Sequence, residues 1–211
     1  MFNKEDWERA VEFHGHVCPG LAIGFKASVE ALQNLKEERS EDEEMVAIVE
    51  NDACGVDAVQ WVTGCTMGKG NLIFRDVGKQ AFSFVLRKNG KGLRYILKPG
   101  ALTHDEHRKL MERVIGGKAS REETEKFREL HDSLAQKIIQ EPLEDNFTQA
   151  PITITLPPKA RIFPTLTCSF CQEGVMEPRA KVKDGEISCP DCADEYKARV
   201  LCLSEKDISG I

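Results

Sequence analysis

The sequence lacks an apolar run long enough to cross a membrane, and it lacks the basic start and apolar stretch of an export signal. It also lacks an excess of basic residues, because 29 lysines and arginines stand against 35 aspartates and glutamates and give a net charge of -6. Proteins that bind nucleic acid usually carry a basic patch or stripe. We therefore expect a cytoplasmic protein without a membrane segment, and we do not expect nucleic acid as a partner.

A complete phosphate-binding motif is also missing from the glycine-rich stretch of residues 64–70. The motif requires four residues between its glycines and a serine or threonine after the lysine, whereas three residues separate Gly64 from Gly68, and Gly70 follows Lys69. The stretch still offers main-chain N–H groups and a basic side chain. We therefore treat Lys69 as a candidate site residue that contacts an anionic substrate.

What the chain does contain is cysteine, with eight residues in two groups. Two C-x2-C pairs separated by 17 residues form the C-terminal group. This spacing is typical of a zinc ribbon, in which each pair supplies two thiolates to one tetrahedral ion and no coordination position stays open. We therefore expect a structural zinc, and Cys202 is expected to take no part. The predicted zinc ligands are Cys168, Cys171, Cys189 and Cys192.

The N-terminal group begins with His14, His16 and Cys18. Imidazole and thiolate both bind zinc, iron or copper, and alternation along an extended segment would point the three side chains to one side. Pro19 favours a helix start at this point, and the positive end of a helix would lower the pKa of the Cys18 thiol. We predict a second transition-metal site with His16 and Cys18 as ligands, and catalytic roles for Cys18 and His14.

Two further cysteines, Cys54 and Cys65, flank a predicted short helix and are candidate catalytic residues, as a further ligand or as redox thiols. They could form a reversible disulfide if their Cα atoms lay within about 7 Å of each other. The alternative is that these cysteines only pack, because free cysteine is among the most buried residue types. For Cys65 the two interpretations carry equal weight.

The remaining histidines are weaker candidates. His104 and His107 stand three residues apart and could bind a metal, but they lie among charged residues, a pattern that favours a solvated helix face. His131 has no evident companion in the sequence. We therefore leave all three outside the predicted sites.

Periodicity and capping signals predict both helices and strands. The predicted helices cover residues 3–11, 19–35, 57–62, 103–115 and 120–140, and the predicted strands cover residues 45–49, 71–77, 80–87, 93–97 and 152–156. Pro157 and Pro158 end the last strand and start a stiff linker. We expect a core domain at residues 1–158 and a zinc ribbon with a tail at residues 159–211, with a ribbon hairpin of residues 175–182 and 186–188 around Asp184 and Gly185.

Three segments resemble the FmdE family, which is named after the FmdE component of formylmethanofuran dehydrogenase. They are FHGHVCPG (residues 13–20), DACGVDAVQ (52–60) and TGCTMGKGNL (63–72). The resemblance implies an α+β core with a mixed β-sheet of the FwdE/GAPDH-domain-like kind, an interlocked homodimer, and a zinc ribbon after the core. It also implies that His16, Cys18, Cys54 and Cys65, with His14 nearby, line a cavity for a metal.

The complex that gives the family its name uses a molybdenum or tungsten pterin centre and iron–sulfur clusters. This chain lacks the spare cysteines and the length for those groups. The resemblance therefore implies a metal-binding enzyme or accessory subunit in one-carbon or molybdenum/tungsten oxidoreductase metabolism. The alternative is a non-catalytic dimeric scaffold whose zinc ribbon docks onto a larger oxidoreductase. The sequence does not identify a substrate.

Overall fold

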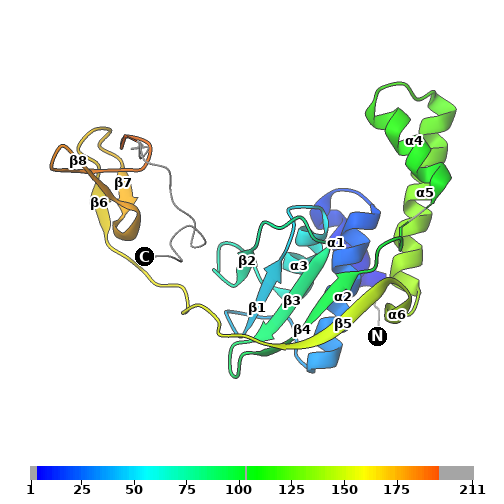
Figure 1. Ribbon diagram of the computed structural model, residues 1–211, viewed down its shortest axis with the longest axis horizontal. Helices are drawn as coiled ribbons and strands as arrows, with labels where there is room; N and C mark the ends of the chain where they lie inside the picture. The colour runs from blue at the N-terminus through cyan, green and yellow to red at the C-terminus, as the bar shows by residue number, and fades with distance from the viewer. Residues whose placement is uncertain (1–3, 103, 195–211) are drawn as a thin grey trace, which may run out of the picture. The chain divides into compact units, whose positions relative to one another are not determined.

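The computed structural model describes residues 4–102 and 104–194 (Figure 1). Contacts divide the chain into two compact units, residues 1–160 and 161–211. No described helix is both long enough and apolar enough to span a membrane. The elements of the first unit are α1 (Lys4–His14), α2 (Pro19–Leu35), β1 (Met45–Val49), α3 (Gly55–Thr63), β2 (Leu72–Phe74), β3 (Ala81–Leu86), β4 (Lys91–Leu97), α4 (Asp105–Ile115), α5 (Arg121–Gln140), α6 (Leu143–Asn146) and β5 (Phe147–Thr153).

The described part of the first unit is built on a mixed sheet of five strands in the order β2-β1-β3-β4-β5. Strand β1 runs parallel to β2, whereas the other neighbouring strands are antiparallel. β3 and β4 form a hairpin whose turn contains Gly90 at a φ of 68°, as the Asn89-Gly90 pair predicts. These observations confirm the predicted α+β core with a mixed sheet.

The core lies between the sheet and the helices α1, α2 and α3, which Figure 1 shows on one side of the sheet. Alternate residues of β1 and β3 contribute to it, with Ala47 opposite Phe84 and Val49 opposite Phe82. Helix α2 adds the fully buried Phe25. This packing fixes the start of α2 and the start of α3 against the same core.

Helices α4 and α5 form a hairpin that projects beyond the sheet in Figure 1. α5 packs on α2, and its buried Ala135, Ile138 and Ile139 belong to the same core cluster as the buried residues of α2. α5 begins with the predicted capping box, in which Ser120 and Glu123 each accept a main-chain N–H of the other. The predicted cap Thr103 lies outside the described residues, and His104 caps α4.

Several predicted element bounds in the first unit are wrong. β2 covers residues 72–74 instead of 71–77, and β4 begins at residue 91 instead of 93. α1 continues to His14 instead of ending near residue 11. β5 covers residues 147–153 instead of 152–156, and Pro151 lies inside it, opposite Leu93. Proline is tolerated there because β5 is an edge strand, which leaves one side of its backbone without a partner strand.

The second unit contains two small hairpins in its described part. Its elements are β6 (Thr165–Thr167), β7 (Gly174–Met176), a 3-10 helix (Glu177–Arg179), β8 (Lys181–Lys183) and β9 (Glu186–Ser188). β8 and β9 meet at Asp184 and Gly185, both with positive φ. Val175 pairs with β6 instead of continuing toward β8, so the predicted single hairpin is wrong at this end. Cys202 lies outside the described residues.

Candidate metal centre

The starts of α2 and α3 lie close together because the residues at which these helices touch include glycines, which have no side chain to hold them apart. A Cβ atom on Gly24 would lie 2.0 Å from the carbonyl oxygen of Gly55, and one on Gly20 would lie 3.2 Å from the Cβ of Cys54. Real Cβ atoms essentially never approach a backbone atom as closely as the first distance. The two glycines therefore allow the contact that brings Cys18, just before α2, close to Cys54, just before α3.

Both cysteines occupy N-cap positions. The Sγ atom of Cys18 accepts a hydrogen bond from the Leu21 N–H at 3.2 Å, so the thiol takes the place of the usual capping oxygen. Cys54 makes no side-chain capping bond, which leaves its sulfur available to another partner. The sequence-based prediction that each cysteine lies at a helix start is confirmed.

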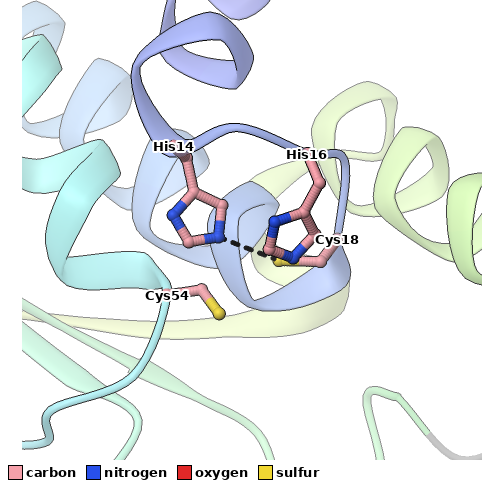
Figure 2. A group of neighbouring side chains, drawn as sticks. All are labelled: His14, His16, Cys18 and Cys54. Atoms are coloured by element: carbon pink, nitrogen blue, oxygen red, sulfur yellow. Dashed lines mark hydrogen bonds between the residues drawn. The ribbon is translucent and has the colours of Figure 1, made fainter.

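The two histidines reach the cysteines through a sharp turn after α1. Gly15, at a φ of 94°, turns the chain between His14 and His16, so the segment is bent instead of strand-like as predicted. The two imidazole rings lie 4.4 Å apart between centroids, and Nε2 of His14 lies 3.9 Å from Sγ of Cys18. Figure 2 shows the side chains of His14, His16, Cys18 and Cys54 converging.

These four residues form a candidate metal-binding group. Their ligand atoms all lie within 4.8 Å of one another. Two imidazoles and two thiolates suit zinc and related transition metals in tetrahedral geometry. The residues therefore fit a metal ion, with Cys54 and His14 joining the predicted ligands His16 and Cys18.

A carboxylate supports this group from outside. Nδ1 of His14 lies 2.7 Å from Oδ2 of Asp57, in the first turn of α3. A proton on Nδ1 that bonds to the carboxylate leaves the Nε2 lone pair free to face Cys18 and to bind a metal ion. Sequence reasoning missed Asp57 as a site residue, because 43 positions separate it from His14.

The pKa of Cys18 differs from the prediction. Burial is the largest cause, and together with the neighbouring Cys54 it raises this pKa to about 11, although the N–H of Leu21 acts in the opposite direction. The helix start therefore does not make Cys18 a reactive thiolate on its own, because desolvation of the charged form outweighs the hydrogen bond. A bound cation would favour the thiolate.

A family comparison identifies the group to which this fold and these ligands belong. A model described as "FmdE, Molybdenum formylmethanofuran dehydrogenase operon" matches residues 13–148, a stretch that includes all four ligands. The chain belongs to the FmdE family. A crystal structure of a tungsten formylmethanofuran dehydrogenase FmdE-like protein from Syntrophus aciditrophicus is similar, with 25% identity and a TM-score of 0.58, over 90% of this chain and 92% of the other.

A second relative, from Archaeoglobus fulgidus, has a different kind of name: it is called a probable S-adenosyl-L-methionine-binding protein. It is 34% identical over 200 residues, which are 91% of this chain and 53% of the relative. This FmdE-family chain therefore spans about half the length of the curated relative that it matches.

The other two candidate residues of this FmdE-family chain lie outside the four-residue group. Cys65 is fully buried, its Sγ donates to the carbonyl oxygen of Met45 at 3.5 Å, and burial raises its pKa. Lys69 donates through Nζ to the carbonyl oxygens of Ser40 and Glu41, at 3.0 and 3.2 Å. Each has a structural partner, and their catalytic roles stay predictions.

The histidines dismissed in the sequence form a buried contact of their own. Nε2 of His107 lies 2.8 Å from Nδ1 of His131, the His107 ring stacks with Phe127, and the His131 ring lies tilted against Phe127. His107 is only 8% exposed, so the prediction that it lies on a solvated face is wrong. The prediction that His131 has no companion is also wrong, because the partner lies on the neighbouring helix and not near it in sequence.

The second unit holds the other candidate metal group of this FmdE-family chain. The sulfur atoms of Cys168, Cys171, Cys189 and Cys192 lie within 4.8 Å of one another, as expected for a zinc ribbon. Main-chain N–H groups of Cys171 and Cys189 lower the pKa of Cys168 to about 6. The neighbouring thiols, Cys189 first, raise the pKa of Cys192 to about 12, and a shared cation would relieve this competition.

Proposed function

We propose that this FmdE-family protein binds a transition-metal ion, zinc by its donor set, at His14, His16, Cys18 and Cys54. The observation that carries the proposal is the convergence of four ligand atoms within 4.8 Å, with the Asp57 carboxylate on the far side of the His14 ring. Histidines and cysteines that only pack in a core do not require converging ligand atoms or a carboxylate bonded to the imidazole. A separate zinc in the ribbon would be structural.

The core ion would serve an enzyme or an accessory subunit in one-carbon or molybdenum/tungsten oxidoreductase metabolism. A catalytic ion needs a position open to water or substrate, and four protein ligands fill a tetrahedron. His16 is the ligand suited to give way, because its side chain is exposed and no hydrogen bond to the described residues holds it. The buried Cys18 and the carboxylate-bonded His14 would stay in place.

The test is metal content per chain in anaerobically purified protein, measured by plasma mass spectrometry. We expect two ions in the wild type, one in Cys18→Ser and one in Cys168→Ser. Cys65→Ser is the matched control, because it also removes a buried core thiol but lies outside the ligand group. Equal metal content in the wild type and Cys18→Ser would refute the core site.

A non-catalytic scaffold is the second candidate function, and the surface of the ribbon favours it. Phe170, Met176 and Val182 are 44%, 49% and 78% exposed. Apolar side chains of this kind are typical of a contact with another protein. We propose that the ribbon docks onto a larger oxidoreductase and that the protein is a homodimer, in which the projecting α4–α5 hairpin gains a second packing surface. Light scattering at several concentrations tests the homodimer. Capture of the partner by the full chain and by a ribbon-deleted chain tests the docking contact, which the deletion should abolish.

A further inference from the structure

A pocket of about 440 Å³ opens beside the candidate metal group, and His14 and Cys54 form part of its wall. The rest of the wall comes from the end of β1, the loop between β1 and α3, the first turns of α3, β2 and the loop before β2. A larger groove of about 650 Å³ contains none of the four ligands in its wall. Of these two, the pocket of about 440 Å³ is therefore the one whose wall includes candidate metal ligands.

The polar part of the pocket wall is acidic. Asp52 and Asp57 both line it, and no lysine or arginine does so among the described residues. One oxygen of Asp57 is bonded to His14, which leaves the other free, and Asp52 has no ion-pair partner within residues 4–102 and 104–194. The amide of Gln60 lines the same side of α3.

Exposed apolar side chains also line the pocket. Met67 is 68% exposed and Phe74 is 42% exposed, and both line the pocket. Large apolar side chains that stay exposed at the mouth of a pocket offer contact area to an apolar ligand group. The lining of the pocket thus combines acidic and apolar side chains.

Charge balance then selects the ligand. A divalent ion with two thiolates and two neutral imidazoles is neutral, so the ion does not compensate Asp52 and Asp57. The start of α3 supplies only about half a positive charge. The pocket keeps a net negative charge, which favours cations and disfavours carboxylates and phosphates.

We propose that this pocket binds a small organic ammonium compound, with a primary amine on an apolar body. The ammonium group donates to Asp52 and to the free oxygen of Asp57, and the body packs against Met67 and Phe74. This inference rests on the proposed metal site for its charge balance. It replaces the expected anionic substrate contact through Lys69, whose ammonium group is bonded to two main-chain carbonyls.

Three probes that share one ring test the proposal: benzylamine, benzyl alcohol and benzoate. Calorimetric titration into the full-length, zinc-loaded protein should show benzylamine binding at least about tenfold more tightly than benzyl alcohol, because charged hydrogen bonds are lost in the alcohol. Benzoate should not bind. Equal binding of the three probes, preference for benzoate, or binding of none of them would overturn the proposal.

Variants locate the binding. Asp52→Asn should weaken benzylamine binding about tenfold, since it removes one charged acceptor without touching a metal ligand. Phe74→Ala should weaken both benzylamine and benzyl alcohol. Asp76→Asn is the control, because it removes a nearby exposed carboxylate that does not line the pocket. Unchanged affinity in Asp52→Asn would refute the assignment.

Metal content measured on the same samples separates this inference from the proposed function. One ion per chain in the wild type that is retained in Cys18→Ser would refute the core metal site, whatever the probes do. Two ions per chain with no selectivity for benzylamine would leave the metal site standing and overturn the pocket assignment.

Discussion

Nδ1 of His14 lies 2.7 Å from Oδ2 of Asp57, and this contact joins the end of α1 to the first turn of α3. The carboxylate faces the nitrogen of the ring opposite to the one that approaches Cys18. Asp57 therefore positions a ligand without belonging to the ligand group.

Replacement of Asp57 by asparagine should lower the affinity of the core site for zinc by about 10- to 100-fold, the range typical of lost supporting carboxylates. Competition for zinc with a chromophoric chelator measures this affinity. Asp52→Asn is the matched control, because it also removes a carboxylate from the pocket wall but has no contact with His14. Equal losses in both variants would mean that charge, and not the bond to His14, supports the ion.

Gly24→Ala should destabilise the first unit by about 1–3 kcal/mol, since its new Cβ would overlap the Gly55 carbonyl and force α2 and α3 apart. The core metal should be lost or weakened with it, because Cys18 and Cys54 would separate. Urea unfolding and metal content measure the two effects. Gly68→Ala is the control, as nothing lies within 4 Å of its Cβ position, and a similar loss there would contradict the argument.

The α4–α5 hairpin should loosen in acid. Burial is the main cause that lowers the pKa of both His107 and His131 below 6.5, and His107 and His16 also lower that of His131, against Asp132. The folded state therefore holds both rings neutral, and the unfolded state takes up protons first. Stability is fully present above pH 6.5 and falls as the pH drops from 6.5 toward the lowered values.

Hydrogen exchange in residues 105–115, corrected for its intrinsic pH dependence, measures this loosening. Protection should fall below pH 6.5 in the wild type. His131→Phe, which keeps an aromatic ring beside Phe127 but removes one titrating group, should show a smaller change with pH. Protection that is independent of pH in the wild type would contradict the prediction.

A strong chelator should unfold the described part of the second unit while the sheet of the first unit stays protected. The ribbon strands have three residues each, and a unit this small needs its metal to fold. Hydrogen exchange measured separately for residues 165–188 and for residues 81–97 tests this. Full protection of the ribbon strands after verified metal removal would show that the unit folds without zinc.

The sequence predicted the elements that carry strong local signals. The strand at residues 45–49 follows from its apolar, β-branched run, the start of α5 from the Ser120 and Glu123 pair, and the β3–β4 turn from Asn89-Gly90. The same local logic placed Cys18 and Cys54 at helix starts. The same logic was wrong for the last strand, which was predicted to begin after Pro151. Proline lies inside β5 because β5 is an edge strand.

The site itself depends on contacts that have no local signature. The His14–Asp57 bond and the His107–His131 pair join positions 43 and 24 residues apart. The pKa of Cys18 likewise depends on burial in the folded core. Burial raises this pKa more than the helix start lowers it, and only the helix start is visible in the sequence. The four-cysteine ribbon could be predicted because its ligands keep a fixed spacing along the chain.

The ligands of the core site come from three separate helix ends: His14 and His16 at the end of α1 and just beyond it, Cys18 before α2, and Cys54 before α3. An ion held there would cross-link three helices. If it binds the folded chain and not the unfolded one, each tenfold rise in free zinc above the dissociation constant should add about 1.4 kcal/mol to the stability of the first unit. Metal supply would thus set how much of this protein survives proteolysis in the cell.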